Sequence, residues 1–450
     1  MHEELAISPD IDIVSPEAYT DNETLLRSYA RLRAEQPVAW VDVEPYRPFW
    51  AVTKHADIIE VEKQHELFIN EPRLTLLPKS IEDQAEAEPK GLEALKMLFA
   101  LLRNSNRRWS DFQSLRRTNA KAGNARHSKV RTVIHMDEPE HKKYRMLTHS
   151  WFMGRGVASL EGRIRGLATK FVDKMLAADG QCDFAQDIAV WYPLEVIMTI
   201  LGLPPEDAPQ LLVWTQQLLS ASDPEIQKSD QYGQDVMLEM YAYFGKLIAD
   251  RRKQPTDDLA SVVVHAMVDD NPIELVDMLS YFLIVATAGH ETTSSAIAGG
   301  MLAFIGNPSQ FELLRDKPEV ARTLPDEVVR WVTPVRHFTR TATDDYTLRG
   351  VDIAKGESLG IFYLSANRDA EAFDIDPNEF RIDRMPNRHL AFGHGTHHCL
   401  GRVLASLEIR CIFEELAHRV TGLELAGEPA WIASNFTGGL KRLPIRYEAA

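Results

Sequence analysis

The segment AFGHGTHHCLG, residues 391–401, constrains the fold more than any other part of this sequence. Its cysteine, Cys399, stands just before a run with apolar residues at helical spacing, so a helix is expected there. The glycines Gly393, Gly395 and Gly401 allow the backbone to turn tightly and to come close to a flat or bulky group. A thiol at a helix N-terminus gains about 0.3–1 kcal/mol toward thiolate. The pattern therefore favours a thiolate that faces a ligand.

Four roles for Cys399 are compatible with these residues. Zinc could bind with His394, His397 and His398, but adjacent side chains such as His398 and Cys399 rarely reach one ion together. A catalytic nucleophile would need a base from elsewhere in the chain. A small buried cysteine without chemistry is the plainest alternative. A haem iron with an axial thiolate uses one cysteine and leaves the glycines to the porphyrin face, so it fits the residue types best.

Composition and charge exclude other classes of protein. Three cysteines are too few for a disulfide framework and indicate a reducing, cytoplasmic setting. The formal charge of −16 argues against nucleic-acid binding. The N-terminus has no apolar run, and residues 282–305 carry Glu291 near their middle, where a carboxylate costs about 2.5–3.5 kcal/mol in a bilayer. We therefore expect no membrane segment and a helix over 282–305 buried inside the protein.

Neither a repeat nor a Gly/Ser-rich linker divides the chain, so we expect one domain over residues 1–450. Residues 38–43 and 49–54 are strand-like and should pair as a hairpin around EPYRP. The prediction is a mainly α fold with a small β portion built from both chain ends. Its helical part is expected mainly at 137–333 and 400–420, and its β-rich part at about 35–70 and 335–390.

The cysteine segment resembles the haem-binding loop of the cytochrome P-450 monooxygenases. Residues 392–401 fill every fixed position of F-G-x-G-x-H-x-C-x-G, and AGHETT at 288–293 resembles the family's A-G-x-[DE]-T-T stretch. The likeness covers nearly the whole chain and is greatest to the bacterial soluble members that hydroxylate monoterpene alcohols such as terpineol. It implies the family fold, a triangular prism of helices around a buried haem b. It also implies an axial thiolate and a set of cofactor contacts, namely Cys399 on iron with Phe392, Gly393, Gly401 and Ala288 around the haem.

The AGHETT stretch is unusual for a helix interior. Gly289 beside an acid and two threonines disfavours a helix and would permit close approach of a bound molecule. Thr292 can bond back to a main-chain carbonyl and open a local groove for water. A polar kink of purely structural use is the alternative. By resemblance, Glu291 and Thr292 relay protons for cleavage of the O–O bond of dioxygen.

Two further motifs place charged residues at helical spacing. In DEVVRW, Glu327 and Arg330 lie three apart and can pair; by resemblance Arg384 completes this structural cluster. In DEPEHKKYR, His141 and Arg145 lie four apart on one helix face. By resemblance these two, with Arg340 and His397, bind the two haem propionates, which need charged partners when buried.

Electrons must come from outside the chain, because no G-x-G-x-x-G flavin fingerprint follows a strand. By resemblance the donor is an iron–sulfur ferredoxin with an NAD(P)H-dependent ferredoxin reductase. Ferredoxins of that kind are acidic, so basic residues near the thiolate side, such as Arg402, Arg410 and Lys142, are expected to guide docking. We expect a monomer.

The substrate is expected to be small and apolar. By resemblance the pocket is lined by Val285, Ala286, Val335, His337 and Phe436, and residues 73–131 form an extended region that covers it. The alternatives within the family are a steroid or aromatic hydroxylase and a peroxide-driven haem oxygenase. A haem-based sensor or carrier is a more distant alternative, for which no signalling segment is present.

Overall fold

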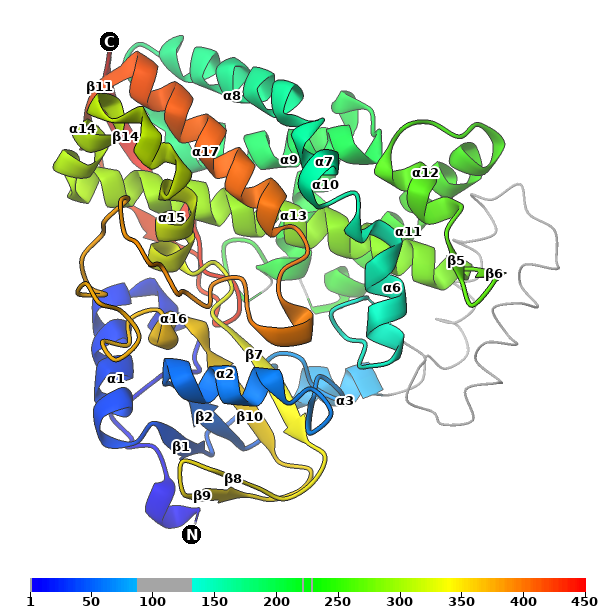
Figure 1. Cartoon of the computed structure of the whole chain (residues 1–450), viewed down its shortest axis with the longest axis vertical. Helices are drawn as coiled ribbons and strands as arrows, with labels where there is room; N and C mark the ends of the chain where they lie inside the picture. The colour runs from blue at the N-terminus through cyan, green and yellow to red at the C-terminus, as the bar shows by residue number, and fades with distance from the viewer. Residues whose placement is uncertain (1, 87–131, 221, 228–229) are drawn as a thin grey trace.

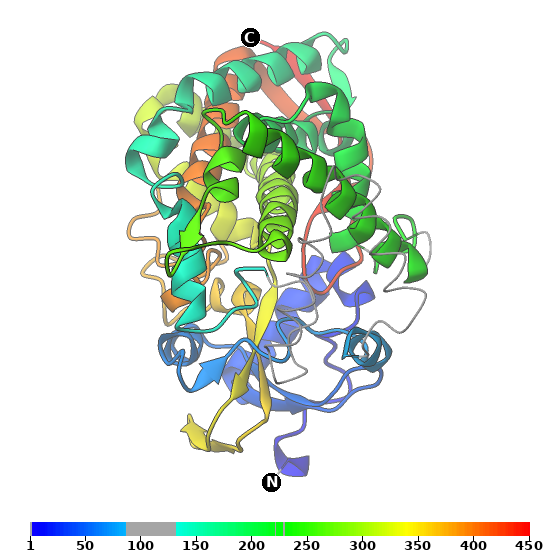
Figure 2. The same ribbon diagram turned by 90° about the vertical axis from the view of Figure 1, so that its right-hand side faces the viewer.

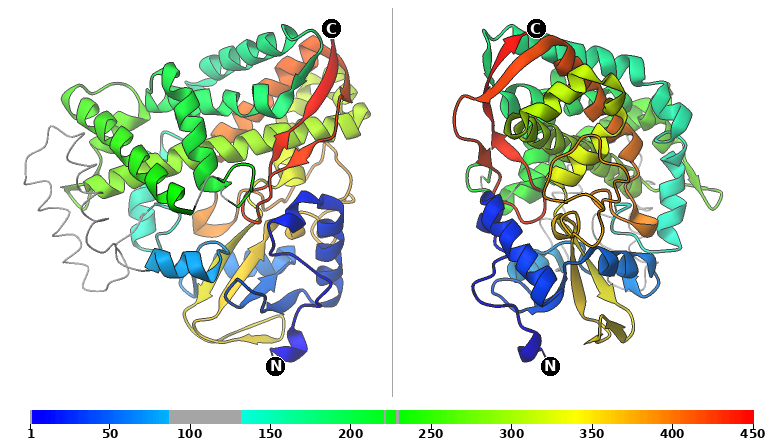
Figure 3. Two further views of the ribbon diagram at one scale, coloured as in Figure 1. Left: turned by 180° about the vertical axis from the view of Figure 1, so that it is seen from behind. Right: turned by 60° about the vertical axis from the view of Figure 1, so that its left-hand side comes forward.

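A computed structural model describes residues 2–86, 132–220, 222–227 and 230–450. The N-terminal segment and the main sheet lie at one end of the molecule, and most helices gather at the end that carries the C-terminus (Figures 1 and 3). The helices are α1 Asn22–Glu35, α2 His55–Lys63, α3 Lys79–Glu86, α6 Glu140–His149, α7 Gly154–Ala158, α8 Glu161–Leu176, α9 Trp191–Leu201, α10 Ala208–Leu219, α11 Asp230–Lys253, α12 Leu259–Val264, α13 Leu275–Gly306, α14 Pro308–Asp316, α15 Leu324–Val332, α16 Tyr363–Ala366 and α17 Arg402–Arg419.

The main sheet joins the two halves of the chain. Its five strands run in the order β1-β2-β10-β7-β3. The predicted hairpin is confirmed, since β1 and β2 pair antiparallel with Val38 opposite Val52. The later strand β10 pairs parallel to β2 and antiparallel to β7. The bounds are β1 Val38–Val41, β2 Phe49–Val52, β3 Phe68–Ile69, β7 His337–Ala342 and β10 Ser358–Phe362.

Most of the smaller sheets lie where the sequence pattern did not predict strands, whereas the strand pair within 346–353 falls in the predicted β-rich part at 335–390. A three-stranded sheet, β11-β14-β4, joins two strands that follow the last helix to one from residues 181–183, and is seen in red and green in Figure 3. Residues 363–390, expected in the β-rich part, instead hold α16 and irregular loops. Most of the strands in these sheets have two or three residues, too few to show an alternation in one sequence, whereas β11 and β14 have six each. Their bounds are β4 Gln181–Asp183, β5 Met267–Val268, β6 Asn271–Pro272, β8 Tyr346–Leu348, β9 Val351–Ile353, β11 Val420–Leu425, β12 Ala430–Trp431, β13 Leu440–Arg442 and β14 Pro444–Ala449.

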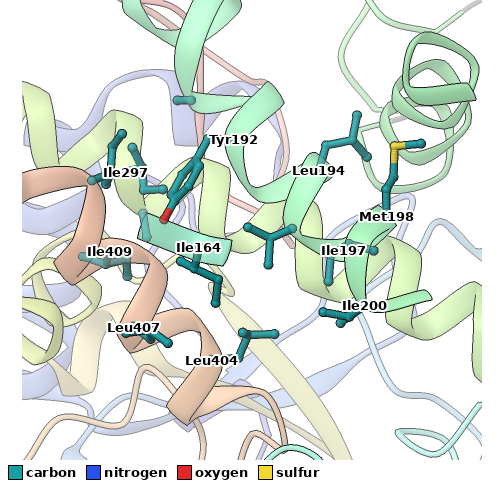
Figure 4. Close-up of a cluster of buried hydrophobic side chains, with 14 of the residues drawn as sticks. Ile164, Tyr192, Leu194, Ile197, Met198, Ile200, Ile297, Leu404, Leu407 and Ile409 are labelled. Carbon is teal, nitrogen blue, oxygen red and sulfur yellow. The ribbon is translucent and has the colours of Figure 1, made fainter. Parts of the chain in front are cut away.

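Helix α13 runs through the middle of the helical part (Figure 2). Its buried residues pack into one large core cluster with α8, α9 and α17. Figure 4 shows part of this cluster, in which Ile197, Ile297 and Leu407 come from three of these helices. Within the described ranges, no helix combines the length and apolarity that crossing a bilayer requires. The expectation of a buried helix over 282–305 agrees with this arrangement.

Two glycines of α13 mark where neighbouring helices come closest. A Cβ on Gly289 would lie 2.4 Å from Ile197 Cδ1 of α9, and one on Gly299 would lie 2.6 Å from Val332 Cγ2 of α15. Any larger side chain at either position would require the neighbouring side chain to shift. Gly289 therefore serves helix packing, whereas the sequence suggested close approach of a bound molecule; the contact with Ile197 could not be seen without the fold.

Of the expected pocket-covering region at 73–131, residues 87–131 lie outside the described residues, and 73–86 include α3.

Candidate active site

The cysteine loop is folded tightly on itself before α17. The Cys399 N–H donates to the Phe392 carbonyl at 2.8 Å. Gly393 and Gly395 have φ of +71° and +67°, conformations that favour glycine. A Cβ on Gly395 would lie 2.2 Å from the Glu62 carbonyl, so this glycine lets the loop pack against α2. A Cβ on Gly401 would lie 4.0 Å from the Cys399 sulfur, so glycine there leaves space beside the thiol.

The surroundings of Cys399 pull its pKa in both directions. Burial raises the pKa of the thiol, and this effect is the largest. The N–H groups of Gly401 and Arg402 and the positive charges of Arg145 and Arg402 lower it in part. The helix N-terminus therefore acts as the sequence suggested, but burial outweighs it. A bound metal cation deprotonates a coordinating thiol outright, so iron would hold this sulfur as thiolate.

Residues of both family motifs remain partly accessible in the folded chain. Phe392, Cys399 and Gly401 remain half-buried within the cysteine loop. Ala288 is exposed and Thr292 half-buried, although α13 runs through the middle of the protein. No part of the described chain covers these residues fully, and they are the ones that the family motifs assign to the haem. Three or more converging His, Cys, Asp or Glu side chains, as zinc requires, do not occur among the described residues.

The four residues expected to bind the propionates come together from helix α6, strand β7 and the cysteine loop. The rings of His141 and His397 stack with centroids 3.9 Å apart. Burial, followed by the charges of His141, Arg340 and Arg145, holds the pKa of His397 well below its usual range. Arg145 also donates to the His398 carbonyl at 2.5 Å, which ties α6 to the cysteine loop. This concentration of donors and positive charge suits a pair of carboxylates.

Two residues that sequence reasoning missed hold this group in place. Asn70 donates through Nδ2 to His397 Nε2 at 2.8 Å and to the Ile134 carbonyl at 3.0 Å. Glu62 accepts from Arg340 Nη2 at 3.1 Å and from the Tyr363 hydroxyl at 2.7 Å. Burial raises the pKa of Glu62 to about 7, although Arg340 and Tyr363 lower it in part. Neither residue lies in a recognisable motif, so only the fold brings them to the site.

The acid–alcohol pair lies on α13 as expected. Thr292 Oγ1 donates to the Ala288 carbonyl at 2.7 Å, the back-bond that the sequence suggested. Glu291 is buried, and burial raises its pKa to about 7, with the Ser220 hydroxyl lowering it in part. The neighbouring His290 is held neutral by burial, with a pKa of about 4, and binds the Val190 carbonyl and Thr215 rather than the acid.

The expected substrate residues fall into two groups. Val285, Val335 and Phe436 are half-buried, so part of each side chain is free to contact another molecule. Ala286 and His337 are fully buried. His337 Nε2 accepts from the Leu76 N–H and its Nδ1 donates to the Asn435 carbonyl, both at 3.0 Å. The role expected for Ala286 and His337 does not fit this packing, because surrounding protein already covers them; His337 instead joins three chain segments.

The structural cluster is fully assembled and buried. Arg330 makes two bonds of 2.7 Å to Glu327, and Arg384 Nε donates to the same carboxylate at 3.0 Å. The remaining guanidinium N–H groups bind main-chain carbonyls of the loop that precedes the cysteine segment, at Asn367, Ile375, Asp376, Pro377 and Glu379.

Of the basic residues expected to guide a partner, Arg402 and Lys142 are exposed, and Arg410 pairs with Glu161 at 3.0 Å.

Comparison with known proteins identifies the family. The family model for Cytochrome P450 matches residues 319–420. Cytochrome P450-terp of Pseudomonas sp is 36% identical over 448 residues, which covers 97% of this chain and 97% of that protein. A Steroid C26-monooxygenase of Mycolicibacterium smegmatis is 32% identical over 94% of this chain and 90% of that protein. The crystal structure of CYP108D1 from Novosphingobium aromaticivorans matches with a TM-score of 0.83 at 37% identity, covering 99% of this chain and all of that one. The chain therefore belongs to the cytochrome P450 family and is a monooxygenase that carries haem b on a cysteine thiolate.

Proposed function

We propose that this enzyme hydroxylates a compact apolar, terpenoid-like substrate with dioxygen and two electrons from a ferredoxin. The substrate C–H bond, dioxygen, two electrons and two protons give the alcohol and one water. The observation that carries the proposal is the buried Glu291 next to Thr292 on α13. An acid and an alcohol at this point supply the protons that dioxygen reduction consumes, which a peroxide-driven oxygenase does not need.

In this proposal Cys399 is the iron ligand, and His141, Arg145, Arg340 and His397 hold the propionates. The haem, when bound, supplies the iron at which dioxygen is reduced and its oxygen is inserted into a C–H bond. Phe392, Gly393 and Gly401 fix the loop around the sulfur, and Ala288 leaves room on the opposite side. Thr292 presents its hydroxyl above this face, and Glu291 holds and replaces the proton.

Substrate class rests on the pocket residues and on the relatives. Val285, Val335 and Phe436 offer apolar surface, which recognises a substrate by shape and burial. The relative named P450-terp is more similar to this chain than the steroid monooxygenase, at 36% against 32% identity. A steroid or aromatic substrate is the second candidate, favoured by the steroid C26-monooxygenases among the relatives.

We further propose that an acidic ferredoxin docks where α17 begins, at the exposed Arg402. We expect a monomer, because the exposed large apolar side chains of the described residues, such as Met146 and Met385, lie on separate elements.

The test of substrate class is a binding screen. Terpineol, other terpenoids, steroids and small aromatic compounds are added to the purified enzyme, and the change of iron spin state on displacement of water is followed by absorbance. We expect the tightest response from terpenoids; responses confined to steroids or aromatics would contradict the terpenoid assignment.

The test of site residues uses two variants. Thr292→Ala should keep haem and the substrate-induced spin change but divert electrons to peroxide, because proton delivery is impaired. Cys399→His should lose the red-shifted absorbance band of the reduced carbon monoxide complex. Unimpaired coupling of electrons to product in Thr292→Ala would contradict the proton-relay role.

A further inference from the structure

A polar cavity of about 180 Å³ lies behind the acid of α13. Glu291, Ser294 and Ser295 line it from α13, and Gln216 lines it from α10. Further walls come from the loop after α10, through Glu225, and from strand β13, through Lys441 and Arg442. A cavity of this volume with polar walls holds several ordered waters.

The inner end of the cavity is the buried acid Glu291, which has the Ser220 hydroxyl as a neighbour. The Glu291 side chain is 6% exposed, and its Oε2 has no hydrogen-bond partner among the described residues. His290 Nδ1 lies 4.0 Å from Glu291 Oε2 and is itself bonded to Thr215. A buried carboxyl oxygen without a partner is costly unless water reaches it, and the cavity is where water can do so.

The outer end reaches the surface at a group of four charges. The Glu225 and Arg442 side chains are 53% and 48% exposed and pair at 2.6 Å. Lys441 pairs with Glu225 at 2.6 Å and with the buried Asp223 at 3.0 Å. Two cations and two carboxylates balance, so this mouth presents no net charge that would repel protons. It also holds the loop after α10 to β13.

We propose that this cavity is the route by which protons from solvent reach Glu291. The inference rests on the proposed role of Glu291 as proton donor. Each proton that the Glu291 carboxyl gives up is replaced by one from a cavity water, with Ser294 and Gln216 ordering the waters. That water regains its proton from bulk solvent at the rim formed by Glu225, Lys441 and Arg442.

The test measures proton access to Glu291 separately from turnover. In the holoenzyme at about pH 6, where the raised pKa keeps Glu291 protonated, its infrared carbonyl band is identified as the band lost in Glu291→Gln. The time for this band to shift after transfer to D2O reports proton exchange. Peroxide formed per NADPH consumed, with a surrogate ferredoxin and reductase, is measured in parallel.

Ser294→Val removes one polar wall, and Gln216→Leu is a second, independent block from α10. We expect each variant to slow the exchange about ten-fold or more and to raise the peroxide yield. The reason is that complete loss of positioned proton transfer lowers a reaction rate by about 10²–10⁴-fold. Ser280→Val is the matched control. Ser280 is a buried serine on the same helix, about 21 Å from Ser294 along the helix axis, and its variant should behave as the parent enzyme.

Parental exchange times in both Ser294→Val and Gln216→Leu would overturn the proposal. A Glu291→Gln variant with the parental product yield would instead overturn the proposed role of Glu291. The infrared measurement still decides in that case whether the cavity conducts protons, so the two failures are distinguishable.

Discussion

At the scale of single residues, burial decides the proton affinity of the acid on α13. Glu291 has a pKa raised to about 7, chiefly because burial disfavours its charged form. Near neutral pH it therefore exists in both forms, which suits a group that must give up and regain a proton. The raised value also links this residue to stability, because the unfolded chain would titrate near 4.5.

The folded state retains a proton on Glu291 between pH 4.5 and about 7 that the unfolded chain has lost, so its stabilising contribution falls as pH rises through this range. Glu291→Gln is neutral at every pH. Its free energy of unfolding, relative to that of the parent, should therefore rise by on the order of 3 kcal/mol between pH 5 and pH 8. Denaturant titration of both proteins at the two pH values checks this. If the free energies of unfolding of the variant and the parent differ by the same amount at pH 5 and pH 8, the raised pKa of Glu291 is contradicted.

At the scale of elements, one buried charge cluster fixes the loop that leads to the cysteine segment. Glu327 and Arg330 come from α15, and Arg384 comes from the loop. All three side chains are 0–1% exposed, and each guanidinium also binds loop carbonyls. The cluster thereby joins α15 to residues 375–384, just ahead of the haem-binding loop.

Glu327→Gln should destabilise the protein by about 3–5 kcal/mol, because it leaves two guanidinium groups buried without their carboxylate. Haem content should fall with it, since the loop before Cys399 loses its anchor. The matched control is Glu23→Gln, which breaks an exposed i,i+4 pair with Arg27 and should cost about 0–1 kcal/mol. Denaturant midpoints and the haem absorbance per protein check both; equal effects of the two changes would contradict a structural role for the cluster.

At the scale of the whole molecule, a chain of net charge −16 must still attract an acidic electron donor under the proposed function. Arg402 opens α17, is exposed and lies close enough to Cys399 for its charge to lower the pKa of the thiol. A positive residue at this point can orient a partner toward the sulfur side despite the overall charge, because attraction between close surfaces depends on local charge.

Arg402→Glu should raise the KM for an acidic ferredoxin roughly ten-fold at low salt, and the difference should shrink at high salt as the charges are screened. Substrate-induced spin change should be unaffected. Lys355→Glu, in the exposed turn after β9 and far from α17 in Figure 1, is the control and should leave the KM unchanged. Steady-state kinetics with varied ferredoxin decide the matter, and an unchanged KM in Arg402→Glu would contradict docking at this point.

The sequence alone determined what depends on local pattern. The long apolar run at 282–305 with Glu291 near its middle predicted most of α13 as a buried helix, and strand pattern with turn residues predicted the β1–β2 hairpin. The spacing around Cys399 and in AGHETT carried the family resemblance, because iron ligation and a helix groove need particular residues within a few positions. Short strands such as β4 and β12 were not predicted, because two or three residues are too few to show the period of a strand.

The tertiary structure decided everything that depends on contacts between distant segments. Only packing shows that Gly289 faces Ile197 and that His337 joins its own strand to the segments of Leu76 and Asn435. Packing also shows that Asn70 contacts His397 and Glu62 contacts Arg340, two of the residues expected to bind the propionates. The cavity behind Glu291 likewise joins α10, α13 and β13. Burial and partner choice are properties of the assembled core, so no local pattern records them.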